Sequence, residues 1–148
     1  MKQPILNIIL TDDDDDDRLF FSEVLDEIEL QTSLSLFKNG EELMEYLLKP
    51  TNVFPNIIFL DLNMPKKNGM QCLCEIRSNP LLQNLFIAIY STSSSEKDIE
   101  DTFANGANIY LNKPSSFGKL REMVEKVLRM DFEQHNSTLN LKTFTFRI

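Results

Sequence analysis

The segment Asn56-Ile-Ile-Phe-Leu-Asp-Leu-Asn-Met-Pro65 decides the fold. Four consecutive apolar residues, Ile57 to Leu60, end at Asp61, and a loop with Pro65 and Gly69 follows. A short apolar run without alternation is typical of a strand that is buried on both faces, as in parallel sheets covered by helices. The segment therefore predicts a central strand of a parallel sheet, with Asp61 at its carboxyl end.

The same unit, an apolar strand followed by an amphipathic helix, recurs along the chain. We expect the other strands at residues 5–10, 33–37, 85–90 and 109–111. We expect helices around residues 19–28, 43–48, 70–76, 95–104 and 117–130, where apolar residues recur at helical spacing. Strands and helices that alternate in this way predict an α/β fold, with a parallel sheet between two layers of helices.

Composition narrows the classes of function. The 148 residues suit one domain, and the net charge of −8 would repel a phosphate backbone, so we expect no direct DNA binding. The N-terminal apolar run is too short to span a membrane and lacks the cleavage site of a signal peptide. Cys72 and Cys74, separated by one residue, are too sparse for a disulfide framework. We therefore expect a cytoplasmic protein with reduced thiols and no membrane partner.

Polar side chains follow the expected strands at the points where they end. Ligands of open α/β sheets bind at the carboxyl ends of the strands. The residues found there are Asp12 and Asp13 after the first strand, Asp61 after the third, Ser91 after the fourth and Lys113 after the fifth.

The three aspartates need a compensating charge. Two carboxylates ~4 Å apart repel each other by about 4 kcal/mol at an effective dielectric constant near 20. Mg²⁺ prefers oxygen ligands and is commonly bound by one or two carboxylates together with a phosphate. Lys113 adds a fixed positive charge, and Ser91 adds a hydroxyl donor. These groups predict a phosphoryl-transfer site with a carboxylate nucleophile.

Four motifs at these strand ends resemble those of the receiver domains of bacterial two-component response regulators. The motifs are Ile9-Leu-Thr-Asp-Asp13, Phe59-Leu-Asp-Leu-Asn-Met-Pro65, Ile89-Tyr-Ser-Thr92 and Tyr110-Leu-Asn-Lys-Pro114. The resemblance covers approximately residues 4–130. It implies a flavodoxin-like, doubly wound sheet of five parallel strands in the order 2-1-3-4-5, with five helices in three layers. The motifs also resemble a single-domain subgroup that includes partners of phytochrome-type histidine kinases.

The resemblance implies how the acidic residues act. Asp61 accepts a phosphoryl group from a sensor histidine kinase or a phosphotransfer protein. Asp13 and Asp61 bind Mg²⁺ through their carboxylates, and Asn63 binds it through its backbone carbonyl. Asp12 holds a water molecule that is bound to the metal.

The resemblance also implies roles at the fourth and fifth strands. Lys113 pairs with the phosphoryl group, and Ser91 donates a hydrogen bond to a phosphoryl oxygen, unless the register differs by one residue and Thr92 does so. Tyr110 then moves from an outward to a buried rotamer. The bond between Lys113 and Pro114 is expected to be cis.

The function implied is that of a stand-alone switch, which changes its surface and signals to another, unknown protein. A phosphorelay shuttle, which passes the phosphoryl group to a histidine phosphotransfer protein, remains an alternative. An enzyme on a similar fold is disfavoured: a flavodoxin-type enzyme needs a phosphate loop where the aspartates stand, and a haloacid-dehalogenase-like phosphatase carries its nucleophile after the first strand. We therefore expect no catalysis beyond the phosphorylation and dephosphorylation of the chain itself.

Six aspartates stand in a row from Asp12 to Asp17. A calcium-binding loop is excluded, because the run has no glycine and follows a strand. We expect the last four to begin a helix, since aspartate is a good N-cap and the first turn favours carboxylates. A further hypothesis is that their extra negative charge tightens Mg²⁺ binding.

Residues 131–148 are expected to form a C-terminal extension beyond a receiver domain of residues 1–130. Leu139 and Leu141 alternate with polar residues, and Phe144, Phe146 and Ile148 then alternate in the other register, which suggests a strand with a break. Such a segment can pack on its own domain or pair with a second subunit in a homodimer, and the pattern does not decide between the two.

Overall fold

The computed structural model describes residues 4–49 and 53–146, and its strands form one parallel sheet. The strands are β1 (Leu6–Thr11), β2 (Thr32–Phe37), β3 (Ile57–Leu60), β4 (Ile87–Ser91) and β5 (Ile109–Asn112). They pair in the order β2-β1-β3-β4-β5, so the predicted order is confirmed.

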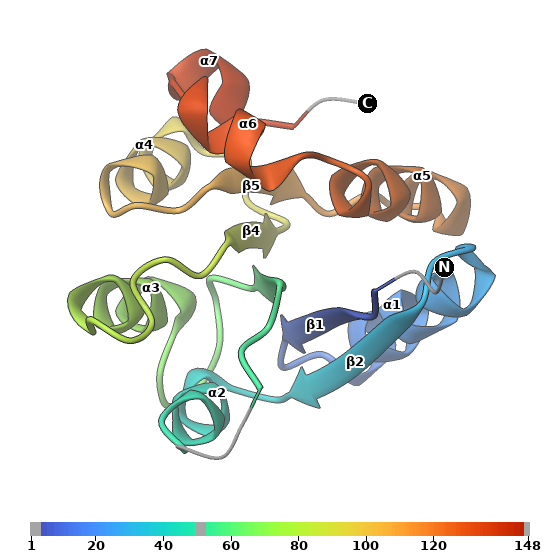
Figure 1. Cartoon of the computed structure of the whole chain (residues 1–148), viewed down its shortest axis with the longest axis horizontal. Helices are drawn as coiled ribbons and strands as arrows, with labels where there is room; N and C mark the ends of the chain where they lie inside the picture. The colour runs from blue at the N-terminus through green and yellow to red at the C-terminus, as the bar shows by residue number, and fades with distance from the viewer. Residues whose placement is uncertain (1–3, 50–52, 147–148) are drawn as a thin grey trace.

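Helices cover both faces of this sheet (Figure 1). The helices that follow the five strands are α1 (Asp15–Glu27), α2 (Gly40–Leu47), α3 (Gly69–Ser78), α4 (Glu96–Ala104) and α5 (Phe117–Leu128). Figure 1 shows α1 and α5 on one side of the sheet and α2, α3 and α4 on the other, which gives the three predicted layers. Among the described helices, none combines the length and the apolar character that a membrane crossing requires.

The strand residues alternate between two apolar cores. Leu10 and Phe59 are buried with Phe21 of α1 on one face, and Ile58 packs with Leu73 of α3 on the other. Each such side chain contributes about 1.5–3 kcal/mol when it leaves water. Because β3 lies in the middle of the sheet, all four of its residues are buried, which explains its unbroken apolar run.

The acidic run begins a helix, as predicted. Asp14 is the N-cap of α1, and its side chain accepts hydrogen bonds from the backbone N–H groups of Asp16 and Asp17. The first turn that follows is acidic, which suits the positive end of the helix dipole. α4 begins in a similar way at Ser95, whose side chain accepts from the N–H of Asp98.

Gly69 allows α3 to begin directly against the end of β3. A Cβ atom at this position would lie 2.2 Å from the carbonyl oxygen of Asp61, which is too close for any side chain. The Gly69 N–H donates to the carbonyl of Leu62 at 3.0 Å and closes the loop. Glycine at position 69 therefore holds the β3–α3 loop around Asp61.

The C-terminal extension does not form the predicted strand. It folds into α6 (Phe132–Ser137) and α7 (Leu141–Phe144), and only Thr145 makes an isolated parallel bridge, to Tyr110. Asn140 begins α7 through a capping box with Thr143, and this local hydrogen bonding competes with an extended chain. Ile148, which belonged to the expected strand, lies outside the described residues.

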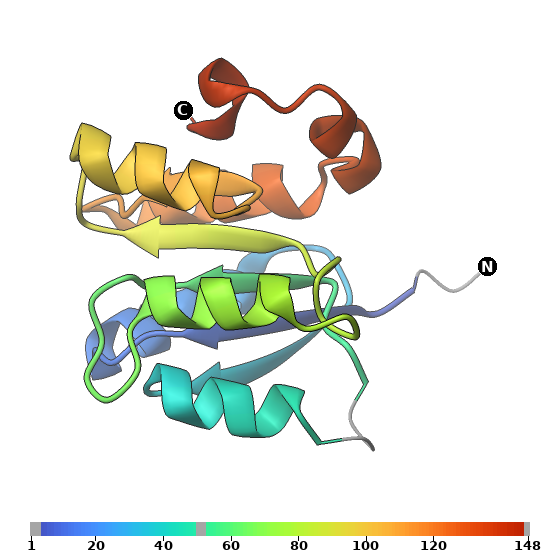
Figure 2. The same ribbon diagram turned by 90° about the vertical axis from the view of Figure 1, so that its left-hand side faces the viewer.

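This extension packs against its own domain at the β5 edge of the sheet (Figures 1 and 2). Phe144 is fully buried, with its ring 5.2 Å from that of Phe103 and 6.1 Å from that of Tyr110. The Phe146 N–H donates to the Tyr110 carbonyl at 3.0 Å. Of the two alternatives, packing of the extension on its own domain is therefore the one observed. Pairing with a second subunit stays a prediction.

The expectation of a cis bond before Pro114 was wrong. The described residues contain no cis peptide bond, so Lys113 and Pro114 are joined in trans. Trans is the more stable form of a bond before proline by about 0.5–1 kcal/mol.

The close approach at Gly69 predicts a loss of stability on substitution. Gly69→Ala should lower the free energy of unfolding by ~1–3 kcal/mol, because the methyl group forces α3 away from β3. Gly118→Ala is the control: nothing lies within 4 Å of a Cβ atom there, and alanine in a helix gains up to ~1 kcal/mol. Urea denaturation measures the free energy of unfolding of both variants, and equal values would contradict the steric argument.

The burial of Phe144 predicts that the extension stabilises the domain. Phe144→Ala should lower the free energy of unfolding by ~3 kcal/mol, at the low end for a buried phenylalanine. Phe54→Ala, at a phenylalanine that is 48% exposed, should cost less than ~1 kcal/mol. Urea denaturation at two protein concentrations compares them, and a similar small loss in both variants would show that the extension does not pack as described.

Candidate functional site

The sheet brings the predicted aspartates together at the carboxyl ends of β1 and β3. Asp12, Asp13 and Asp61 each offer a carboxylate oxygen, and these atoms all lie within 4.8 Å of one another. The Asp12 side chain is fully buried and Asp61 is nearly so, whereas Asp13 is exposed. The trio therefore has two buried members and one that faces solvent.

Lys113, which directly follows β5, neutralises part of this charge. Its ammonium lies 2.9 Å from Asp12 Oδ2 and 3.1 Å from Asp61 Oδ2. A third carboxylate, that of Asp17 in the first turn of α1, lies 2.8 Å away. Since an ammonium has three N–H donors, these contacts occupy all of them.

Burial changes the protonation equilibria of the trio. Loss of hydration raises the pKa of Asp12 to about 6, and the contacts with the Asp14 N–H and with Lys113 only partly offset this. Burial also raises the pKa of Asp61, against the attraction of Lys113. Burial acts to lower the pKa of Lys113, but its bonds to Asp17 and Asp12 outweigh it and the net shift is upward. The charge of Lys113 therefore does not fully offset the cost of burying the ionised carboxylates, although the lysine itself stays protonated.

The residues present fit a hard divalent cation. Carboxylate oxygens are the ligands that Mg²⁺ prefers, and the exposed side at Asp13 leaves room for the waters it keeps. The Asn63 N–H points to Asp61 Oδ1 at 3.4 Å, which places the Asn63 backbone beside the cluster. Asp12, Asp13, Asp61 and the Asn63 carbonyl are the groups that would hold the ion.

Ser91 and Tyr110 lie inward beside the cluster. Ser91 is fully buried and its Oγ accepts a hydrogen bond from the Ser93 N–H at 3.1 Å, whereas Thr92 is exposed. The Lys113 N–H donates to the Ser91 carbonyl at 2.8 Å and joins the ends of β4 and β5. Tyr110 is also buried, and its hydroxyl donates to the Ser93 carbonyl at 2.9 Å. The ring thus occupies the inward position here, and its movement stays a prediction.

Sequence reasoning missed three residues at this site. Asp17 lies in the first turn of α1, three residues after the N-cap Asp14, and no local pattern indicated that its carboxylate would contact Lys113. Arg18 donates to the backbone carbonyl of Asp12 at 2.6 Å and also pairs with Asp15. The Tyr90 ring lies under the Lys113 ammonium at 5.1 Å, a contact between distant segments that no local pattern indicates.

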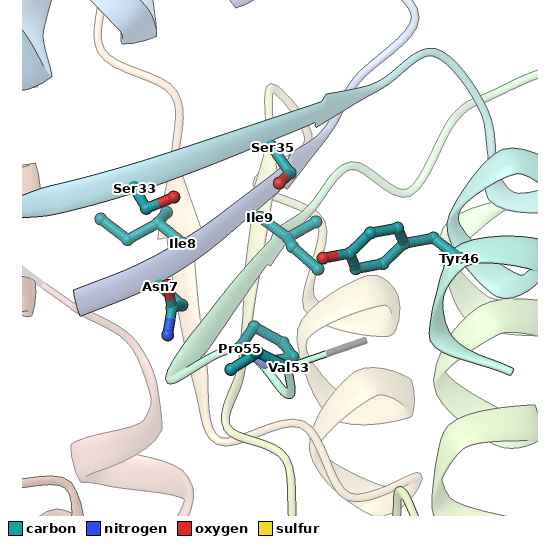
Figure 3. Close-up of a pocket in the computed structure, with 8 residues that line it drawn as sticks. All are labelled: Asn7, Ile8, Ile9, Ser33, Ser35, Tyr46, Val53 and Pro55. Carbon is teal, nitrogen blue, oxygen red and sulfur yellow. The ribbon is translucent and has the colours of Figure 1, made fainter. Parts of the chain in front are cut away.

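A small hollow at the other end of the strands does not offer comparable chemistry. Figure 3 shows its lining, which comes from the starts of β1 and β2, from α2 and from the segment before β3. Asn7, Ser33, Ser35 and Tyr46 supply its polar groups, and none of the described residues that line its space of about 50 Å³ is charged. The acidic cluster is therefore the better candidate for a functional site.

The chain is similar in sequence and in fold to known proteins of one family. Residues 8–125 match the response regulator receiver domain family. Response regulator Rcp1 of Synechocystis sp. is 32% identical over 109 residues, which cover 71% of this chain and 74% of Rcp1.

Two solved structures each superpose on this chain with a TM-score of 0.78. The phosphorylated cyanobacterial phytochrome response regulator RcpA is 30% identical, and the match covers 84% of this chain and 91% of RcpA. The Mn²⁺-bound form of Rcp1 is 29% identical, with 91% of this chain and 97% of that chain covered. With the sheet order and the acidic cluster in place, these matches show that the chain belongs to the response regulator receiver domain family.

Proposed function

We propose that this receiver domain accepts a phosphoryl group on Asp61 in a Mg²⁺-dependent reaction and that the change in its surface signals to another protein. The observation that carries this proposal is the position of the Asp61 carboxylate. One of its oxygens contacts the Lys113 ammonium at 3.1 Å, and the residue also belongs to a trio of carboxylates that fits a divalent cation.

In the proposed reaction, a carboxylate oxygen of Asp61 attacks the phosphorus of a phosphohistidine on the donor. The new O–P bond forms as the P–N bond breaks, and the imidazole leaves with the electron pair of that bond. Lys113 and the Ser91 hydroxyl donate hydrogen bonds to the phosphoryl oxygens. When bound, Mg²⁺ supplies positive charge to these oxygens as they approach the carboxylates.

The contacts around Ser91 suggest how phosphorylation of Asp61 changes the structure of the surface. When the Ser91 hydroxyl turns to a phosphoryl oxygen, its bond with the Ser93 N–H at 3.1 Å is strained or lost. The Ser93 carbonyl accepts the Tyr110 hydroxyl at 2.9 Å, and Tyr110 contacts α7. We propose that Tyr110 is the switch residue and that the face formed by α4 and β5 carries the signal.

Similarity to the phytochrome regulator RcpA favours a phytochrome-type histidine kinase as the donor of the phosphoryl group.

We propose that residues 1–130 are the receiver domain and that residues 131–148 are an extension, with a homodimer as a further prediction. The free Cys72 and Cys74 are consistent with action in the cytoplasm. The protein is proposed to act by binding proteins rather than DNA or membranes, and to transform no substrate beyond its own aspartate.

Phosphorylation of Asp61 can be tested with a small phosphodonor. The full chain, incubated with Mg²⁺ and acetyl phosphate, should gain the mass of one phosphoryl group, and Asp61→Asn should gain none because the amide is a poor nucleophile. Asp26→Asn, at an exposed aspartate on α1, should behave like the wild type. Intact-mass spectrometry reads all three, and a wild-type chain that gains no phosphoryl mass would overturn the proposal.

Metal binding can be tested without any phosphodonor. Mg²⁺ should raise the melting temperature of the wild-type chain, since it binds the native state. Asp13→Asn should weaken Mg²⁺ binding at least ~10-fold, the lower limit for loss of an outer-shell group at a metal site. Titration of the melting temperature with Mg²⁺ measures this, with Asp26→Asn as the control. Equal Mg²⁺ affinity of Asp13→Asn and the wild type would remove Asp13 from the metal site.

A further inference from the structure

Asp17 makes the shortest of the three contacts that Lys113 makes with carboxylates. Its Oδ2 lies 2.8 Å from the Lys113 ammonium, compared with 2.9 Å for Asp12 and 3.1 Å for Asp61. The Lys113 side chain is only 9% exposed and that of Asp17 is 37% exposed. The pair therefore lies at the mouth of the site, with the lysine inside and the aspartate towards solvent.

Asp17 differs from the other two partners of Lys113 in what it contributes. Asp12 and Asp61 belong to the trio that fits a cation, whereas Asp17 does not. The backbone of Asp17 is fixed, because its N–H donates to the N-cap side chain of Asp14 at 3.0 Å. The carboxylate is thus presented to Lys113 from a rigid helix start, and its visible role is to hold the ammonium.

An incoming phosphoryl group must compete with these carboxylates for the N–H donors of Lys113. All three N–H donors of Lys113 already point to carboxylates, so one contact has to be released before the ammonium can serve a phosphoryl oxygen. Asp12 is buried and accepts the Asp14 N–H at 3.0 Å as well, so it is anchored in the interior. Asp17 is the most exposed of the three partners, and water can hydrate its carboxylate when the contact opens.

We propose that Asp17 is a positioning residue, which holds the Lys113 ammonium at the mouth of the site and releases it to the phosphoryl group. Its carboxylate thereby limits how readily the unphosphorylated domain takes up an anionic phosphoryl group. This inference rests on the proposed phosphorylation of Asp61 and assigns a residue that regulates the same site.

The alternative is that Asp17 only adds negative charge to the start of α1. Asp16 provides a matched control, because it lies in the same helical turn, is exposed and makes no contact with Lys113 among the described contacts. Asp16→Asn and Asp17→Asn change the net charge equally and alter the helix start alike. Only the second removes the ionic contact with Lys113.

The test uses the full chain with Mg²⁺ and two readouts. The first is the initial rate of phosphorylation at several concentrations of acetyl phosphate, which separates KM from kcat. The second is the affinity for beryllofluoride, which mimics a bound phosphoryl group without reaction. Asp17→Asn should raise kcat/KM and beryllofluoride affinity about two- to fivefold, the range of a partly exposed ion pair. Asp16→Asn should change each by less than twofold, and Asp17→Glu should restore values near the wild type.

The outcomes separate this inference from the proposed function. A wild-type chain that takes up no phosphoryl group overturns both. If the wild type is phosphorylated and Asp17→Asn matches Asp16→Asn in both readouts, only the role of Asp17 is overturned. Urea denaturation of each variant shows that it is folded, and Asp17→Ser, which also suits a first helical turn, repeats the comparison independently.

Discussion

The Lys113 ammonium lies among three carboxylates at the carboxyl edge of the sheet, and the rest of the structure serves to bring these charges together. They come from the residue after β1, the first turn of α1, the residue after β3 and the residue after β5. In the parallel sheet, β1 and β3 are neighbours and the carboxyl ends of all the strands lie at the same edge, which brings these groups together. The two apolar cores supply the stability that keeps carboxylates with raised pKa values in place.

The same edge connects the charges to the surface that the C-terminal extension covers. Ser91 and Lys113 share a backbone hydrogen bond, and Tyr110 bonds to the Ser93 carbonyl. Phe144 packs against the Tyr110 side chain, and the Phe146 N–H bonds to its carbonyl. Because α7 contacts Tyr110, we propose that the extension belongs to the face that would respond to phosphorylation of Asp61.

Much of the fold followed from periodicity, because buried parallel strands leave unbroken apolar runs such as Ile57 to Leu60 and polar residues gather where those runs end. The identity of the aspartates and of Lys113 at the site followed from the same reasoning. The pairing of Lys113 with Asp17 did not, since it depends on side chains from segments 96 residues apart. The extension was wrongly predicted as a strand, because its apolar alternation was outweighed by the capping of α7 at Asn140 and by the burial of Phe144.

The central claim is that Asp61 receives the phosphoryl group while a cation and Lys113 balance its charge. A crystal structure of the full chain grown with Mg²⁺ and beryllofluoride tests this most directly. We predict beryllium bonded to a carboxylate oxygen of Asp61, Mg²⁺ bound by Asp13 and Asp61, and the Lys113 ammonium in contact with a fluorine and no longer with Asp17. An unmodified Asp61 at saturating beryllofluoride, with Lys113 still on its three carboxylates, would contradict it.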